Sequence, residues 1–86
     1  MGFVVYILRS VSDGRLYVGH TNNLSRRLRQ HNDPFARSYT AKRGPWVLMH
    51  SEAHPDRGAA TARERFLKSV AGSREKRRLA GVGQDG

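Results

Sequence analysis

The sequence predicts an α+β fold in which helices flank a small three-stranded antiparallel sheet, in the order ββαβα with a short helix at the end. Three observations predict it. Residues 3–8 form an unbroken apolar run, typical of a strand covered on both faces. The turn signal Ser12-Asp13-Gly14 separates this run from a second strand pattern at residues 16–18. Apolar residues at helical spacing then recur near residues 24–31 and 59–70.

The strands can be placed in more detail. Pleating divides the first strand between two faces, one with Phe3, Val5 and Ile7 and the other with Val4, Tyr6 and Leu8. We expect Gly19 to end the second strand, because glycine permits a turn or a close backbone approach. Asn22 or Asn23 is positioned to cap the helix that follows. Residues 46–49, directly after Pro45, form the third strand.

The first helix has an unusual polar composition. Its wheel has Leu24 and Leu28 on the buried stripe, Arg27 and His31 beside that stripe, and Arg26 and Arg29 on the solvated side. Charged groups are seldom buried unless they are paired, so a guanidinium and an imidazole at the edge of the packed face indicate a functional site. The alternative is that Arg27 lies along the surface on its aliphatic stem and that His31 is a polar residue near a helix end.

The second helix, near residues 59–70, is expected to present an apolar face formed by Ala59, Ala60, Phe66, Leu67 and Val70. Glu64 and Lys68 lie along one margin of that face. Arg63 falls within it, and we expect its stem to pack while its head reaches solvent. We expect His50 and His54 to be strand-end and loop residues rather than a zinc pair, because Pro55 follows directly.

The C-terminal segment sets the end of the domain, and the composition indicates the class of partner. A short basic helix begins near Gly72-Ser73, and residues 81–86 form a flexible tail beyond a single domain at residues 1–80. The chain has 86 residues and a formal net charge of +9, which favours a polyanionic partner, usually nucleic acid. It has no cysteine, which excludes disulfides, thiolate catalysis and cysteine zinc sites. Without a secretory signal or an apolar span, we expect a cytoplasmic protein that does not bind membranes.

A long polar connection at residues 32–45 carries several basic residues. Connections of this length in a compact domain are commonly functional or disordered. Arg37, Lys42 and Arg43 there are candidate phosphate contacts. Tyr39 among them is a candidate for stacking on a base, although it can equally be a simple loop anchor.

Short motifs in a fixed order resemble the GIY-YIG nuclease family, in its small stand-alone bacterial form. Val4-Val5-Tyr6 and Tyr17-Val18-Gly19 correspond to the two name-giving motifs, with ten residues between the tyrosines. Asn23-Leu24-Ser25-Arg26-Arg27 matches the next segment, His31 follows it, and Ala60, Glu64 and Lys68 match the metal-binding helix. Val4 replaces the glycine of the first motif, and His20 stands where some relatives have a lysine. We expect His20 to be a solvent-facing loop residue, with a polar role near the phosphate as the alternative.

The resemblance implies a divalent-metal-dependent endonuclease that hydrolyses DNA with little sequence specificity, selecting by DNA shape as repair or recombination enzymes do. Glu64 would hold Mg²⁺ or Mn²⁺, and Arg27 would contact the phosphate. Tyr6 or Tyr17 would act on the attacking water, and His31 would bind phosphate or relay a proton. His20, Lys68 and Arg74 join the basic loop residues as candidate nucleic-acid contacts.

Each of these residues also has an ordinary structural explanation. The tyrosines are common strand residues, and Glu64 can simply pair with Lys68 one helical turn away. The competing function is a catalytically inactive, basic nucleic-acid-binding module on the same scaffold. RNA stays open as a substrate. We expect a monomer, to which a partner protein can add specificity.

Overall fold

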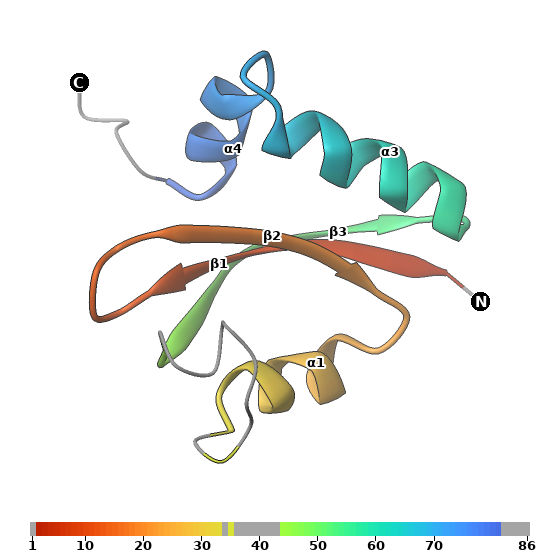
Figure 1. Ribbon diagram of the computed structural model, residues 1–86. Coiled ribbons are helices and arrows are strands. Elements are labelled where there is room, and N and C mark those ends of the chain that lie inside the picture. Colours follow the sequence, from red (N-terminus) through yellow and green to blue (C-terminus); the bar gives the residue numbers. More distant parts are fainter. Residues whose placement is uncertain (1, 34, 36–43, 82–86) are drawn as a thin grey trace.

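The computed structural model describes residues 2–33, 35 and 44–81. Its elements in chain order are β1 (Phe3–Ser10), β2 (Leu16–Thr21), α1 (Leu24–His31), β3 (Trp46–His54), α3 (Arg57–Lys68) and α4 (Ser73–Leu79). The strands form one antiparallel sheet in the order β2-β1-β3. Helices α3 and α4 cover one face of this sheet and α1 lies on the other, which gives three layers (Figure 1). The predicted α+β architecture is confirmed.

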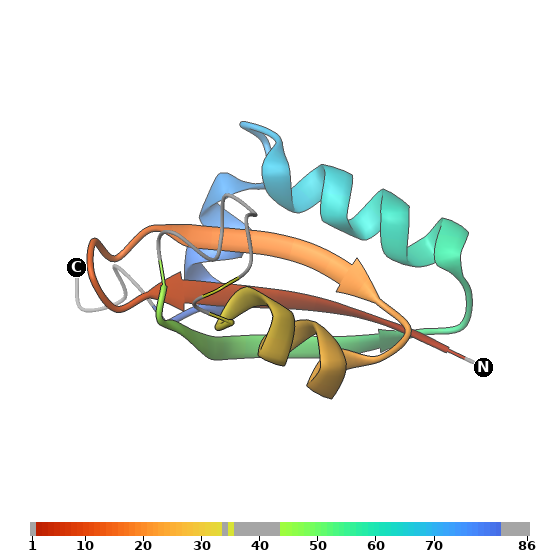
Figure 2. The same cartoon turned by 60° about the horizontal axis from the view of Figure 1, so that its bottom comes forward.

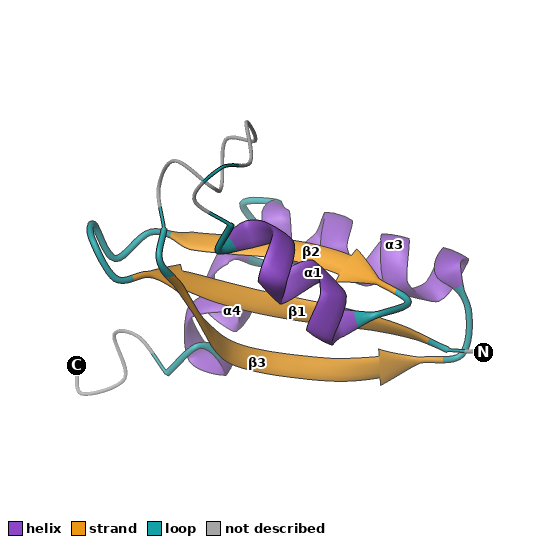
Figure 3. Cartoon of the chain, turned by 90° about the horizontal axis from the view of Figure 1, so that it is seen from below, coloured by secondary structure: helices purple, strands orange, loops and turns teal. Residues whose placement is uncertain are grey.

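The central strand β1 contributes to a core on each face of the sheet. Its two faces follow the predicted alternation. On the side of α3 and α4, the buried residues are Val5, Ile7, Val18, Ala60, Leu67 and Ala80. On the side of α1, they are Tyr6, Leu8 and Trp46, with Tyr17, Leu24 and Leu28 packed against them. Seen from below, α1 lies across the sheet over β1 and β2 (Figure 3). A middle strand covered from both sides explains why the run at residues 3–8 lacks polar positions.

Strands β2 and β3 are both longer than the sequence predicts. Gly19 lies inside β2, opposite Tyr6 in the ladder, and the strand continues to Thr21. The expectation that Gly19 ends the strand is therefore wrong. β3 continues past Met49 to His54, and the two strands flank β1 along its length (Figure 2).

A β-bulge at Met49 changes which residues of β3 face each helix layer. Leu48 pairs with Leu8, but the next position of β1, Ile7, pairs with His50, so Met49 is the extra residue. The bulge moves the polar residues after it onto the face of α3. A one-residue shift exchanges the two faces of a strand, which is why simple alternation does not place the second half of β3 correctly.

Those polar residues form a paired cluster. Glu52 accepts hydrogen bonds from His50 Nε2 at 2.9 Å, from His54 Nε2 at 2.7 Å and from Arg63 Nε at 2.8 Å. Arg63 also reaches Glu75 of α4 at 3.3 Å. Two expectations are corrected. His50 lies inside β3 and His54 is its last residue, rather than a strand-end and a loop residue, and the head of Arg63 is held by two carboxylates.

The helices begin at polar caps. The side chain of Asn23 accepts from the backbone N–H of Arg26 at the start of α1, and Asp56 accepts from that of Ala59 at the start of α3. α3 therefore begins two residues earlier than predicted and ends at Lys68. No helix in the described part of the chain is long and apolar enough to cross a membrane.

The apolar face predicted for α3 is only partly correct. Ala60 and Leu67 are fully buried, but Phe66 is 42% exposed and Val70 is 92% exposed. Val70 lies beyond the end of the helix, in the turn to α4. The Phe66 ring lies on the outside, where the Arg63 guanidinium is 5.8 Å from its centroid. The expectation that Phe66 and Val70 are core residues is wrong.

Candidate active site

A buried tyrosine–histidine pair lies between the sheet and α1. Tyr6 points from the middle of β1 toward α1, and its hydroxyl is 3.0 Å from Nε2 of His31, in the last turn of that helix. Tyr6 is 2% exposed and His31 is 6% exposed. His31 is thus more buried than the half-buried leucines that were expected to form the packed stripe of α1. The imidazole is part of the packing and not a surface residue.

The surroundings shift the pKa values of both groups. Burial, followed by the nearby Arg27 guanidinium, lowers the pKa of His31. Burial and the proximity of Tyr17 raise the pKa of the Tyr6 phenol, and the opposing effect of Arg27 is smaller. At neutral pH the phenol is therefore protonated and the imidazole is neutral. The hydrogen bond between them joins two uncharged groups, and burial disfavours the charged form of each.

Gly19 allows Tyr6 to occupy this position. A Cβ atom on Gly19 would lie 2.5 Å from the Tyr6 hydroxyl, 2.8 Å from its Cζ and 3.2 Å from Cε1 of Tyr17. The first two contacts are shorter than van der Waals packing permits. The motif Tyr17-Val18-Gly19 therefore ends in glycine because the Tyr6 ring passes directly over the backbone of that residue.

Tyr17 connects the two sides of the sheet. Its ring centroid lies 5.0 Å from that of His31 and 6.4 Å from that of Tyr6, on the face of α1. The ammonium of Lys68, which comes from α3, is 5.9 Å from the same ring. Because β2 is an edge strand, this contact runs around the edge of the sheet. Tyr17 is only half-buried, in contrast to Tyr6.

Glu64 of α3 is held by two basic partners on the other face of the sheet. Nδ1 of His20 donates to Oε1 at 2.6 Å, and Nζ of Lys68 donates to Oε2 at 2.6 Å. Burial alone would raise the pKa of Glu64, but the hydrogen bonds from Lys68 and His20 outweigh it and the pKa lies below its usual value. Glu64 is therefore ionised at neutral pH.

The structure corrects the expectation for His20. It is a half-buried residue of β2 that binds Glu64, and not a solvent-facing loop residue. Pleating turns it toward α3, opposite to its neighbour Gly19. The departure from the lysine of some relatives thus places an imidazole in contact with the carboxylate expected to bind metal.

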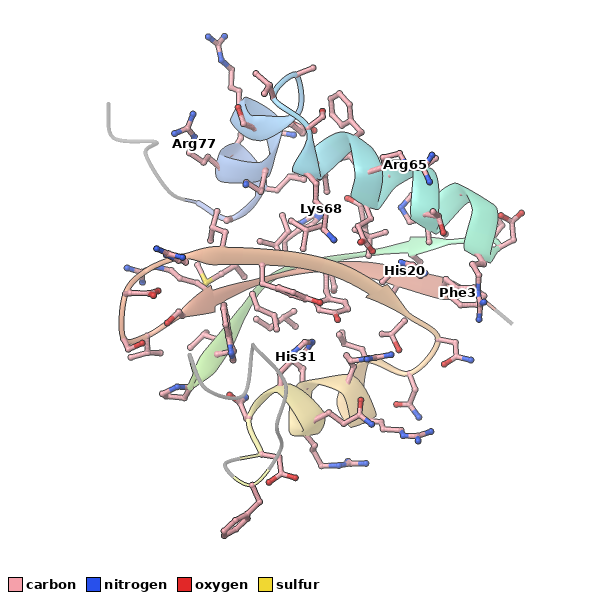
Figure 4. All side chains as sticks on the ribbon, viewed as in Figure 1. Phe3, His20, His31, Arg65, Lys68 and Arg77 are labelled. Atoms are coloured by element: carbon pink, nitrogen blue, oxygen red, sulfur yellow. The ribbon has the colours of Figure 1, made fainter. Side chains whose placement is uncertain are left out.

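The two halves of the site meet where β2 ends. Figure 4 shows His31 pointing to the sheet from α1 and Lys68 pointing to it from α3, with His20 at the upper face. Arg27 is exposed on α1 and shares one surface groove with His20, lined by Phe3, His20, Thr21, Asn22, Arg27 and Arg57. Arg27, from the layer of α1, and His20, which faces α3, are therefore accessible from one side of the molecule.

Glu64 is suited to Mg²⁺ or Mn²⁺ as a single carboxylate ligand. It is ionised and half-buried, and Mg²⁺ is often held by one or two carboxylates together with substrate phosphates and waters. The described residues contain no group of three acidic, histidine or cysteine side chains arranged to hold a metal ion. The donor set thus fits a weakly held ion that enters with its substrate, once Lys68 or His20 gives up one carboxylate oxygen.

The remaining predicted contacts are only partly placed. Arg74 is exposed on α4 and Lys68 is half-exposed at the end of α3. Arg37, Tyr39, Lys42 and Arg43 lie outside the described residues. The sequence analysis did not identify Phe3 and Arg57, which line the groove. The sequence offered one signal for Arg57, its place directly after the capping residue Asp56, and this does not point specifically to a ligand-binding role.

Comparison with known proteins supports the resemblance seen in the sequence. The sequence-family model of the GIY-YIG catalytic domain matches residues 2–78 of the chain. A UPF0213 protein of Haloquadratum walsbyi is 43% identical over 82 residues, covering 94% of this chain and 89% of the relative. A UPF0213 protein of Nitratidesulfovibrio vulgaris is 40% identical, covering 94% and 73%. The solution NMR structure of a UPF0213 protein of Bacillus halodurans has a TM-score of 0.57 and 30% identity, covering 98% of this chain and 88% of that one.

Proposed function

Because the chain belongs to the family of GIY-YIG catalytic domains, a nuclease family, we propose that it is a divalent-metal-dependent endonuclease that cleaves DNA with little sequence specificity. The observation that carries this proposal is that Tyr6, hydrogen-bonded to His31, lies close enough to both Arg27 and the ionised Glu64 for their charges to act on it. Hydrolysis of a phosphodiester requires a phosphate ligand, a route for the water's proton and a site for a cation, and these residues can supply each of them.

Arg27 binds the scissile phosphate in this proposal. Its guanidinium is exposed at the groove, and no carboxylate lies within ion-pair distance of it among residues 2–33, 35 and 44–81. A planar guanidinium can donate two parallel hydrogen bonds to the non-bridging oxygens, and it stabilises the charge that develops there during attack.

The tyrosines and His31 handle the proton of the attacking water. Tyr17 is the more accessible tyrosine and orients the water, while the buried Tyr6 keeps His31 in place. The neutral imidazole of His31 is the terminal acceptor and is reached through the Tyr6 hydroxyl, 3.0 Å from its Nε2. Because burial lowers the pKa of His31, the imidazolium forms only while negative charge develops on the attacked phosphate. As the water oxygen bonds to phosphorus, its proton moves to the Tyr6 hydroxyl while the phenol's own proton passes to Nε2 of His31, and the bond to the leaving oxygen breaks.

Glu64 would hold the metal ion, whose positive charge stabilises the phosphate and the leaving oxygen when it is bound. His20 and Lys68 orient the carboxylate and keep it ionised until the ion arrives. We propose the same coordination for Mg²⁺ and Mn²⁺, since both prefer oxygen ligands.

A plasmid-nicking assay tests the proposal. The wild-type chain should convert supercoiled DNA in Mg²⁺ or Mn²⁺ and lose this activity in EDTA. Glu64→Gln should abolish cleavage and leave DNA affinity nearly unchanged, because removing one acid from a basic surface does not weaken phosphate contacts. Glu75→Gln, at a half-buried carboxylate of α4 that pairs with Arg63 and Arg78, is the control and should cleave normally. Full Mg²⁺-dependent cleavage by folded Glu64→Gln would contradict the metal assignment. Binding without cleavage by the wild type would support the inactive binding module instead.

The choice of DNA target can be measured separately. Sequence readout requires a helix or ribbon in a groove with several side chains on base edges. The two main helices α1 and α3 face the sheet here, and we propose that selectivity comes from DNA shape such as branches, flaps or unpaired ends. Mapping cut sites on two unrelated plasmids should give no shared sequence. Recurrent cleavage at one base sequence in both would show that the chain reads bases.

A further inference from the structure

The groove beside the site contains a second arginine to which neither the family motifs nor the proposed mechanism gives a role. Arg57 is the first residue of α3, and its guanidinium lies 5.2 Å from the centroid of the Phe3 ring, at the start of β1. Arg57, Phe3 and Arg27 line the same groove. Three segments far apart in the sequence, the starts of β1 and α3 and the middle of α1, thus meet at one surface depression.

The two groove arginines differ in their charge pairing from the cations that bind the carboxylates of the sheet and helices. Arg63, Lys68 and Arg78 each have a carboxylate partner. Over the described stretches of the chain, neither Arg27 nor Arg57 has a carboxylate within ion-pair distance. Two exposed guanidinium groups in one groove, neither paired with a carboxylate of the described residues, favour an anionic ligand.

Phe3 holds Arg57 in the groove. Its ring lies under the Arg57 guanidinium, and its centroid is 6.2 Å from that of the His20 ring. Stacking on an aromatic face restricts the guanidinium while leaving its N–H groups available for a ligand. Figure 4 shows Phe3 next to His20 at the same end of the sheet. Because His20 also binds Glu64, the stacked arginine is adjacent to the proposed metal position.

The size and lining of the groove indicate the form of the ligand. Its volume is about 290 Å³, and Thr21 and Asn22 add a hydroxyl and an amide to the cationic lining. This volume is small for a free cofactor but suits phosphate groups of a backbone that passes across the surface. A single DNA strand carries a phosphate at every nucleotide, so a strand bound at Arg27 necessarily brings a neighbouring phosphate close by.

We propose that Arg57, stacked on Phe3, binds the backbone phosphate next to the one that Arg27 holds. This inference rests on the proposed function for its substrate. The two arginines set the direction of the strand across the end of β2, so the attacked phosphorus faces Tyr17 and Glu64. Arg57 is a positioning residue and does not contact the reacting atoms.

The test measures binding without cleavage. Fluorescence anisotropy of a short labelled DNA duplex is followed in EDTA from about 50 to about 200 mM salt, using Glu64→Gln as the background. Adding Arg57→Gln should weaken binding roughly five- to tenfold at about 0.1 M salt and reduce the log–log salt slope by about 0.9. Arg57→Lys should restore the slope but not the full affinity, because the planar stacking is lost. Phe3→Leu should weaken binding less and leave the slope unchanged.

Arg65→Gln is the matched control, an exposed arginine of the same helix that does not line the groove. If Arg65→Gln weakens binding as much as Arg57→Gln, only total charge matters and the subsite is refuted. Unchanged binding in Arg57→Gln, or no measurable DNA binding at all, refutes it too. Cleavage by the wild type is assayed separately. Cleavage with normal binding by Arg57→Gln rejects the subsite alone, whereas Arg57-dependent binding by a chain that never cleaves rejects only the proposed nuclease activity.

Discussion

At the scale of single residues, the site combines groups that are kept neutral with groups that are kept charged. Tyr6 and His31 are buried together and remain uncharged at neutral pH. Glu64 is ionised because His20 and Lys68 stabilise its negative charge. The separation is produced by the sheet, since the neutral pair lies on the face of α1 and the charged group on the face of α3.

Arg27→Lys tests whether the shape of the guanidinium matters in addition to its charge. The substitution keeps the net charge but loses the planar pair of donors, so we expect cleavage to fall roughly 10²-fold. Arg26→Lys, on the exposed side of the same helix, should change the rate by no more than about twofold. Single-turnover cleavage rates measure both variants. Equal losses in the two would place the phosphate contact elsewhere on α1.

At the scale of secondary structure, glycine positions control how closely elements can approach one another. Gly19 lets the Tyr6 ring cross β2, and Gly72 lets the turn before α4 approach the end of α3. A Cβ on Gly72 would lie 1.9 Å from the backbone carbonyl oxygen of Phe66. These approaches cannot be read from hydrophobic periodicity, which describes faces and not distances.

Gly19→Ala should damage stability and activity together. The added methyl collides with a buried ring that cannot easily move, so we expect a loss of about 1–3 kcal/mol in the free energy of unfolding. The Tyr6–His31 hydrogen bond should be disturbed and cleavage should fall with it. Gly58→Ala is the control. Its Cβ would meet only Asp56 Oδ1 at 3.4 Å, so stability should be unchanged or slightly higher. Urea unfolding compares the two, and equal stabilities would show that β2 can move aside.

Hydrophobic periodicity predicts the faces of the strands and helices, but it does not predict the contacts between them. The apolar part of β1, residues 3–8, was predicted correctly because two covered faces make these positions apolar, although the strand continues to Ser10. α1 was predicted correctly because Asn23 and its leucines mark the start and the packed side. β3 was predicted too short because its second half buries Glu52 with His50 and His54 instead of apolar residues. His20 was misplaced because the sequence analysis ended β2 at Gly19. The glycine is instead inside the strand, where it leaves room for the Tyr6 ring. The contact of His20 with Glu64 joins residues 44 positions apart, which no local pattern contains.

At the scale of the whole molecule, the polar cluster around Glu52 joins β3 to α3 and α4. Burial alone would raise the pKa of Glu52, but hydrogen bonds from His50, Arg63 and His54 lower it to about 2 from 4.5. A carboxyl group whose pKa is lower in the folded state stabilises the fold above its unfolded pKa, and this contribution is lost as pH falls toward the folded pKa.

Acid unfolding should therefore depend on Glu52. The wild-type chain should lose about 2–3 kcal/mol of stability from this group between pH 4.5 and about 2. Glu52→Gln should be less stable at pH 7 and should show a much weaker dependence over the same pH range. Urea unfolding at several pH values measures this. Glu75→Gln, at the α4 end of the same network, should keep most of the acid dependence. A wild-type dependence in Glu52→Gln would assign the acid sensitivity to other carboxylates.

The position of β2 at one margin of the sheet has a consequence for self-association. Its outer N–H and C=O groups are not paired within the sheet, and such a margin can accept a strand from another chain. A strand added there would lie beside Gly19 and Tyr17 and would block the route between Lys68 and the proposed site. If the substrate binds as proposed, growth of the sheet on that side would block its access. Any β-sheet assembly of active protomers must use the opposite margin, along β3, where the bulge at Met49 interrupts the regular spacing of the ladder.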